Sequence, residues 1–259
     1  MIIFTIVTCT YNAASVLQQT LHSVLMQEYE GVEHLIVDGA STDSTRAMAE
    51  EYKRVTDARQ CQGRTVKVVS EPDRGLYDAM NKALRMATGD YLVFLNAGDS
   101  LPNRHTLDSV AALAETGGVR PGVLYGETDI VDAKGRFLRH RRLAPPERLT
   151  WKSFRLGMLV CHQAFYVRTD VARRNPYNLN YRYSADVDWC IRVMKDCAAS
   201  GLSLLNLHRV VAHYLDGGMS VANHRDSLRE RFKVMCSHYG LVTTVAMHLW
   251  FFVRAAIRK

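Results

Sequence analysis

The first hundred residues alternate between short apolar runs and longer segments with helical periodicity. The expected strands are residues 2–7, 34–37, 66–69 and 91–95. The expected helices between them are residues 14–26, 44–53 and 76–87. Strands that alternate with helices in this way form βαβ units, which build a parallel sheet covered by helices. We therefore expect an α/β protein with a mostly parallel sheet.

The alternation becomes looser in the second part of the chain. Residues 123–130 and 137–141 flank a turn-like segment at 132–135, which predicts a hairpin. Residues 164–167 have a strand pattern, residues 185–198 are helical, and residues 202–215 are apolar enough for one or two strands. The remaining C-terminal residues have helical spacing.

Charge and cysteine usage limit the classes of function. The chain has 33 Lys and Arg against 26 Asp and Glu, a net charge of +7, and the excess is concentrated in residues 136–155 and 223–259. Such basic patches suit phosphate groups. The six cysteines form no Cys-x-x-Cys pair, which favours a reducing, cytoplasmic setting. No segment reaches the roughly 18 apolar residues of a membrane span.

Three polar clusters follow expected strands, at residues 8–12, 38–43 and 96–99. Ligands of open parallel sheets bind where strands end, so together these clusters predict a binding site. The dinucleotide-binding motif Gly-x-Gly-x-x-Gly and the P-loop motif Gly-x-x-x-x-Gly-Lys-Ser/Thr are both absent from the sequence. The sequence therefore argues against a dinucleotide-dependent enzyme and against a P-loop phosphotransferase. Asp99 suits Mg²⁺ or Mn²⁺, because one carboxylate and substrate phosphates together complete an octahedron.

Several motifs carry a resemblance to a known family. They are VDGASTD at 37–43, SEPDRGLYDAMNK at 70–82, FLNAGD at 94–99, HQAF at 162–165, SADVDW at 184–189 and GGMS at 217–220. In this order they resemble bacterial family 2 glycosyltransferases, particularly those that build colanic acid, O-antigen and capsular polysaccharide. The resemblance covers roughly residues 2–235.

The resemblance implies a GT-A fold, with a Rossmann-like nucleotide-binding sheet flanked by helices and a C-terminal helical extension. It implies one transferase domain at residues 1–222, in which residues 1–100 bind the nucleotide sugar and residues 101–222 face the acceptor. Residues 223–259 form the helical extension. The implied reaction is an inverting transfer from a nucleoside-diphosphate sugar, dependent on Mn²⁺ or Mg²⁺, to a saccharide on a polyprenyl diphosphate lipid.

The family match also assigns roles to single residues. Asp99 is the expected metal ligand, and Asp186 is the expected base that takes the proton of the acceptor hydroxyl. Asp188 competes for the base role, but two residues apart on a helix the side chains point about 200° away from each other. Only one of the two therefore faces the site.

Donor binding maps onto Thr8, Asp38, Asp73 and Asn81. Asp38 either binds the base or shapes its loop, because Gly39 stands where the family often has a second Asp. Asn81 either braces the nucleotide loop or packs within its helix. The acceptor and diphosphate side is expected at His162, Gln163, Asp188, Gly218 and Ser220, although His162 also suits a buried structural histidine and residues 217–220 also suit a plain turn.

The C-terminal segment combines apolar and aromatic residues with terminal cations. Leu241, Val245, Leu249, Phe252 and Ala256 recur at helical spacing, and basic residues follow. Such a helix suits the cytoplasmic face of the inner membrane, and it equally suits packing on the body of the protein. A non-catalytic sugar-nucleotide-binding subunit is the alternative function. The sequence has no aromatic–basic motif for nucleic-acid binding, so we expect no nucleic-acid partner.

Overall fold

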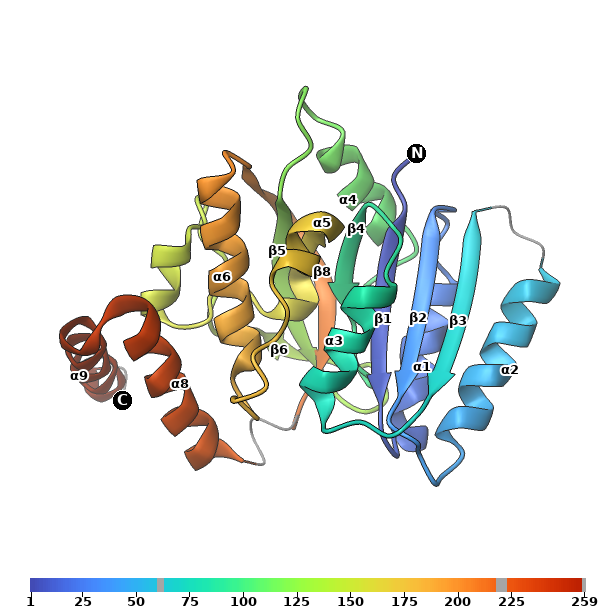
Figure 1. Ribbon diagram of the computed structural model, residues 1–259, viewed down its shortest axis with the longest axis horizontal. Coiled ribbons are helices and arrows are strands. Elements are labelled where there is room, and N and C mark those ends of the chain that lie inside the picture. Colours follow the sequence, from blue (N-terminus) through green and yellow to red (C-terminus); the bar gives the residue numbers. More distant parts are fainter. Residues whose placement is uncertain (60–62, 218–222, 258–259) are drawn as a thin grey trace.

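A computed structural model of the chain describes residues 1–59, 63–217 and 223–257. Eight strands form one sheet (Figure 1): β1 (Phe4–Thr10), β2 (Val32–Asp38), β3 (Arg64–Ser70), β4 (Tyr91–Phe94), β5 (Val123–Val131), β6 (Phe137–His140), β7 (Phe165–Arg168) and β8 (Leu204–Leu215). The helices are α1 (Ala14–Leu25), α2 (Thr45–Ala58), α3 (Leu76–Met86), α4 (Thr106–Ala114), α5 (Thr169–Arg174), α6 (Ala185–Ala199), α8 (His224–Tyr239) and α9 (Leu241–Ile257). Two 3₁₀ turns are η1 (Trp151–Leu156) and η2 (His162–Ala164).

The strand order is β3-β2-β1-β4-β7-β5-β6, and β8 pairs with β5. The first four strands are parallel to one another, whereas β7 runs antiparallel to both of its neighbours. β5 and β6 form the expected hairpin, and β8 returns parallel to β5. The expected α/β fold with a mostly parallel sheet and a C-terminal helical extension is confirmed.

Burial on both sides of the sheet explains why the central strands are continuously apolar. On β2, Leu35 and Val37 join the main core, while Ile36 between them belongs to a smaller core with residues of α1 and α2. This alternation places α1 and α2 on one face of the sheet. Helices α3, α5 and α6 cover the other face (Figure 1).

The carboxyl ends of β1, β2 and β4 meet at one edge of the sheet. Thr10 at the end of β1 is in register with Asp38 at the end of β2. On the other side of β1, Val7 is in register with Phe94 of β4. The polar segments that follow these three strands therefore lie next to one another, as the parallel arrangement predicts.

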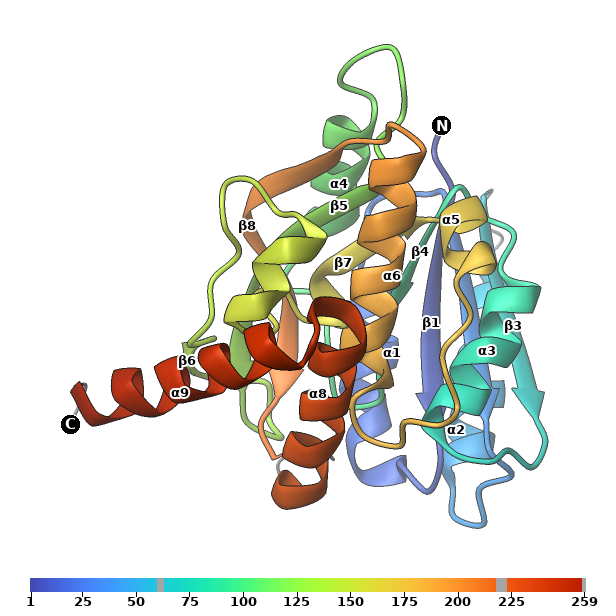
Figure 2. The same cartoon turned by 60° about the vertical axis from the view of Figure 1, so that its left-hand side comes forward.

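The C-terminal helices attach to α6 and η1. α8 packs against α6, and the ring of its Tyr239 stacks on Trp151 of η1 with 5.8 Å between ring centroids. α9 packs on α8 and η1 with one face and projects away from the sheet (Figure 2). Among the described residues, no helix has both the length and the apolar character needed to cross a membrane.

Candidate active site

A cavity of about 550 Å³ opens at the carboxyl edge of the sheet. Asp99 and Asp186 both line it, although they lie 87 positions apart in the sequence. Asp99 follows β4, and Asp186 stands in the first turn of α6. Tyr77, His162 and Gln163 lie in the same walls. The two carboxylates singled out in the sequence therefore share one cavity.

Asp99 is held by two hydrogen bonds, one on each carboxylate oxygen. The backbone N–H of Leu215 donates to Oδ1 at 3.0 Å, and Nε2 of Gln163 donates to Oδ2 at 2.9 Å. Its side chain is buried, and this loss of solvent raises the pKa of Asp99 to about 6, although the two donors act in the opposite direction. At neutral pH the carboxyl is ionised and ready to bind a cation.

The turn that carries Asp99 requires glycine at the preceding position. Gly98 has a φ of +97°, and a Cβ there would lie 2.5 Å from Cδ2 of Leu215. The hydroxyl of Thr20 accepts from the Gly98 N–H at 2.9 Å and donates to the Asp99 carbonyl at 2.6 Å. A second carboxylate at position 98 is thus excluded by strain and by contact with Leu215.

Asp186 is partly buried where α6 begins, and its environment keeps it ionised. Tyr77 donates its hydroxyl to Oδ1 at 3.2 Å, and the Val187 N–H donates to the same oxygen at 2.9 Å. Oδ2 lies 3.4 Å from Nδ1 of His162. Burial by itself raises the pKa of Asp186, but His162 and the charge of Arg231 outweigh it and hold the pKa below its ordinary value.

The hydrogen-bond network assigns the tautomer of His162. Nδ2 of Asn96 lies 3.2 Å from Nε2 of His162, and because an amide nitrogen only donates, Nε2 is the acceptor. The ring proton is therefore on Nδ1, which faces Asp186. Oδ1 of Asn96 is buried and has no hydrogen-bond partner among the described residues.

The η2 turn thus contacts both carboxylates through adjacent residues. His162 lies against Asp186, and Gln163 binds Asp99. Both side chains are buried, so this turn brings one neighbour to each carboxylate. The sequence predicts both residues on the acceptor or diphosphate side, and in the structure each contacts one of the two acidic groups.

Asp188 points away from the cavity. Its carboxylate accepts from Nε of Arg192 at 2.7 Å and contacts Nε2 of His238 at 2.8 Å. His238 belongs to α8, so Asp188 joins α6 to the C-terminal helices. Asp188 does not line the cavity that holds Asp186, and the separation of the two side chains follows from their spacing on the helix.

Thr8 and Asn81, expected to bind the donor, both make hydrogen bonds within the protein. The Thr8 hydroxyl donates to the Leu95 carbonyl at 2.8 Å and lies 3.0 Å from Nε2 of His34. Burial lowers the pKa of His34 to about 3, so its ring is neutral. Asn81 accepts from the Tyr177 N–H at 2.7 Å and donates to the Tyr177 carbonyl at 3.0 Å. Both ends of the Asn81 amide thus bind the backbone of Tyr177.

Asp38 is saturated by the protein and shapes its loop. Its two oxygens accept hydrogen bonds from the hydroxyls of Thr10, Ser41 and Ser70 and from the Ser41 N–H. Burial raises the pKa of Asp38, but these four donors together hold it below its ordinary value. Of the two readings left open by the sequence, the contacts favour the structural one.

Asp73 is the acidic group of the donor set that remains available. A Cβ on Gly39 would lie 2.5 Å from Oδ2 of Asp73, so this carboxylate occupies the space that a side chain at position 39 would enter. Oδ1 accepts from the Gly75 N–H at 2.8 Å. Its charge reaches the cavity, since it contributes with burial to raising the pKa of Cys9 in the cavity wall.

Sequence reasoning missed Tyr77, Asn96 and Arg231 as individual site residues. Tyr77 and Asn96 lie inside recognised motifs, which was the available signal. Arg231 was one cation in the basic segment at 223–259, and nothing local distinguished it from its neighbours. Gly218 and Ser220 lie outside the described residues.

A divalent cation has limited but suitable ligands here. The described residues hold no group of three or more His, Cys, Asp or Glu side chains that would bind a metal by themselves. Asp99 and the unpartnered Asn96 Oδ1 are both oxygen donors, the type that Mg²⁺ and Mn²⁺ prefer. These residues fit a cation whose remaining ligands come from a substrate.

Comparison with known proteins agrees with this geometry. Residues 5–174 match the family described as Glycosyl transferase family 2. A relative, the PGL/p-HBAD biosynthesis glycosyltransferase of Mycobacterium tuberculosis, is 36% identical over 220 residues, which cover 84% of this chain and 78% of the relative. The chain belongs to glycosyl transferase family 2.

Solved structures show the same fold for this glycosyltransferase. S. aureus TarS 1-349, crystallised with UDP-GlcNAc, aligns with a TM-score of 0.69 and 18% identity over 90% of this chain. The mannosyltransferase PcManGT from Pyrobaculum calidifontis, in complex with GDP-Man and Mn²⁺, aligns with a TM-score of 0.61 and 19% identity. The chain spans 64% of the TarS fragment and 63% of PcManGT. The expected GT-A fold is confirmed.

We predict that Asp188→Asn destabilises the protein by about 1–3 kcal/mol, because charge-assisted hydrogen bonds to Arg192 and His238 are lost in a buried place. Urea unfolding followed by circular dichroism measures the change. Asp226→Asn, in an exposed pair with Arg229, is the control and changes stability by less than about 0.5 kcal/mol. Equal stability of Asp188→Asn and the wild type would contradict the structural role.

Proposed function

We propose that this glycosyltransferase moves a sugar from a nucleoside-diphosphate sugar to a saccharide acceptor with inversion, using a divalent cation. The observation that carries the proposal is the pair of carboxylates, Asp99 and Asp186, in one cavity and positioned by one turn. Asp99 is suited to bind a cation, and Asp186 is suited to accept a proton. A single in-line displacement needs both functions, on opposite sides of the reacting carbon.

Asp99 and Asn96 would hold Mn²⁺ or Mg²⁺ together with the donor diphosphate. When bound, the cation neutralises the negative charge that develops on the departing diphosphate. With a single carboxylate, the protein alone binds the cation weakly, and affinity rises when the nucleotide sugar supplies its phosphates. The Mn²⁺ and GDP-Man in PcManGT support this assignment.

Asp186 accepts the proton of the acceptor hydroxyl. Its lowered pKa keeps it in the basic form at neutral pH, and Tyr77 fixes its orientation. The Nδ1–H of His162 faces the second oxygen and stabilises the negative form before the reaction. A carboxylate held by three partners in a cavity has one orientation from which to act as a base.

The donor base lies near Asp73. TarS binds UDP-GlcNAc and PcManGT binds GDP-Man, which supports a nucleotide-sugar donor for this chain. Asp73 is the carboxylate at this edge that the protein does not saturate, and it takes the place of a second Asp after Asp38. We propose that it accepts a hydrogen bond from a ring N–H of the base.

The acceptor belongs to the assembly of a cell-surface glycan. The Mycobacterium relative is named for PGL/p-HBAD biosynthesis, and a second relative, from Bacillus subtilis, for teichuronic acid biosynthesis. We propose a saccharide carried on a polyprenyl diphosphate lipid as acceptor. Residues 1–222 would carry out the transfer, and the segment from residue 223 would contact the cytoplasmic face of the inner membrane.

We predict that Asp186→Asn lowers transfer by a factor of about 10²–10⁴, the usual loss of a general base. Donor affinity changes by less than about twofold, because the amide keeps the size of the carboxylate. Transfer is measured by release of nucleoside diphosphate with acceptor, and affinity by calorimetry. Asp188→Asn is the matched control for a lost carboxylate on the same helix. Normal turnover by Asp186→Asn would refute the assignment.

We predict that Mn²⁺-dependent binding of the nucleotide sugar weakens by roughly tenfold as the pH falls from 7.5 to 5. The pKa of Asp99 is about 6, so the carboxylate is ionised above this pH and protonated, unable to bind the cation, below it. An intact nucleotide sugar is used, because the terminal phosphate of a free nucleoside diphosphate titrates at about pH 6 itself. Constant affinity across this range would contradict the role of Asp99.

The outer face of α9 supports membrane contact. Val242 is 85% exposed, and Leu241, Val245, Leu249 and Val253 are also exposed on this helix. The opposite face is occupied by the body of the protein, with Thr244 fully buried and the ring of His248 against Phe232. An apolar stripe with basic residues nearby lies well at a membrane interface.

We predict that Val242→Gln, Val245→Gln and Leu249→Gln together abolish flotation with vesicles of phosphatidylethanolamine and phosphatidylglycerol. The buried face of α9 is unchanged, so the protein keeps its fold. Val119→Gln with Leu138→Gln, two exposed apolar positions outside α9, is the control and leaves flotation as in the wild type. Undiminished flotation of the triple variant would end the membrane proposal.

A further inference from the structure

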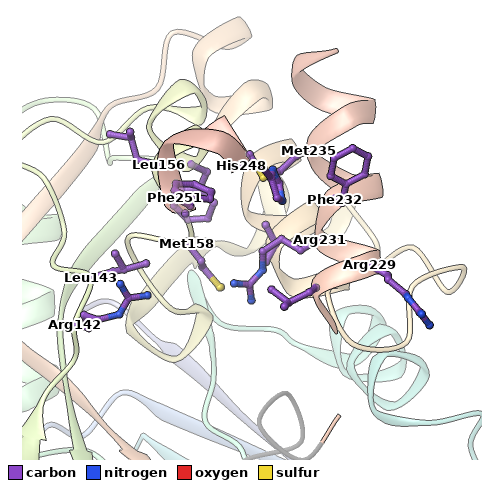
Figure 3. A pocket seen from close by; sticks show the side chains of 14 residues that line it. Arg142, Leu143, Leu156, Met158, Arg229, Arg231, Phe232, Met235, His248 and Phe251 are labelled. Carbon is purple, nitrogen blue, oxygen red and sulfur yellow. The ribbon is translucent and has the colours of Figure 1, made fainter. Parts of the chain in front are cut away.

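A second cavity, of about 570 Å³, lies between η1, α8 and α9 (Figure 3). Its volume is within the roughly 300–1,000 Å³ of small-molecule sites. Most of its lining is apolar, and the apolar side chains are Leu143, Phe154, Leu156, Met158, Val187, Leu228, Phe232, Met235 and Phe251. Neither Asp99 nor Asp186 lines this cavity.

The charged groups of this cavity are all cationic. Arg142, Arg229 and Arg231 line it, and no carboxylate does so among the described residues. Figure 3 shows Arg229 pointing away from the cavity, where it pairs with Asp226, whereas Arg231 points inward toward Met158. The cavity therefore offers an apolar interior with positive charge at its walls, which suits an anionic amphiphile.

Arg231 is the residue that most needs a partner. Its Nε is buried and makes no hydrogen bond with the described residues. A buried donor without an acceptor is destabilising, and a phosphate offers the oxygens that a guanidinium binds best. The buried position of Arg231 is therefore unfavourable while Nε has no acceptor. An anion bound beside Arg231 would supply that acceptor.

The second cavity adjoins the active-site cavity. Met158 and Arg231 line both. At the start of α6, Val187 faces the second cavity while its neighbour Asp186 faces the first. A molecule with its apolar part in the second cavity would thus have its polar end directed at the catalytic carboxylate.

We propose that this cavity binds the hydrocarbon part of a phosphate-bearing lipid acceptor, with the phosphate at Arg142 and Arg231. This inference rests on the proposed function, because it places the acceptor saccharide beyond the phosphate, next to Asp186. The common wall at Met158 and Arg231 favours the acceptor over a structural bilayer lipid as occupant. Burial of hydrocarbon supplies affinity, and the arginines select an anionic head group.

The test measures binding of decyl phosphate below its micellar concentration by equilibrium dialysis, against inorganic phosphate and 1-decanol. We expect saturable binding of one decyl phosphate, at least about tenfold tighter than either part alone, because the site contacts both. Inorganic phosphate or decanol binding as tightly as decyl phosphate would overturn the proposal. The probes contain no sugar nucleotide, so the result is independent of transfer.

Two substitutions assign the binding to this cavity. Leu228→Trp fills it and is expected to lower decyl phosphate affinity by at least about tenfold. Leu179→Trp is the matched control, because Leu179 is 44% exposed against 45% for Leu228 and lines neither cavity. Arg142→Gln should weaken decyl phosphate but not decanol. Unchanged decyl phosphate binding by Leu228→Trp would overturn the proposal.

Release of nucleoside diphosphate from the nucleotide sugar without acceptor checks the proposed function separately. We expect Leu228→Trp to keep this release, because Leu228 does not line the active-site cavity, while losing transfer to a lipid acceptor. Full transfer to a lipid acceptor by Leu228→Trp would overturn the inference. Absence of transfer from the nucleotide sugar to any saccharide acceptor by the wild-type protein would instead contradict the proposed function and leave the binding result standing.

Discussion

The active site depends on one short turn that contacts two carboxylates. His162 lies against Asp186, and the next residue, Gln163, binds Asp99. The two acidic groups come from the loop after β4 and from the start of α6, which are far apart in the sequence. Two adjacent buried side chains lie against these carboxylates, so the proposed cation ligand and the proposed base are close to one turn before any substrate binds.

Burial and neighbouring groups shift the pKa values of the two carboxylates in opposite directions. Asp99 loses solvent and its pKa rises to about 6, whereas the surroundings of Asp186 outweigh the same effect and lower its pKa. Arg231 contributes to this difference from α8, a helix that packs on α6. The C-terminal segment is thus part of the electrostatics of the site, because its Arg231 acts on Asp186, the proposed base.

The sequence predicts the fold closely, and the site only in part. Strand and helix patterns locate every element of the first hundred residues, since apolar periodicity is a local property. The roles of Asp186 and Asp188 depend on distant partners: His162 and Tyr77 surround one, and His238 of α8 binds the other. Asp38 likewise has the pattern of a ligand, but hydroxyls of Thr10, Ser41 and Ser70 saturate it. Except for the Ser41 contact, these contacts are between residues far apart in the sequence, so no short motif can predict them.

The most direct measurement is the anomalous diffraction of Mn²⁺ in crystals grown with a nucleotide sugar. The account predicts one strong Mn²⁺ peak at about 2.2 Å from a carboxylate oxygen of Asp99. It also predicts the transferred sugar between this cation and Asp186, with the base near Asp73. A bound nucleotide sugar whose diphosphate and Mn²⁺ lie away from Asp99, or whose anomeric carbon cannot be reached from Asp186, would contradict the account.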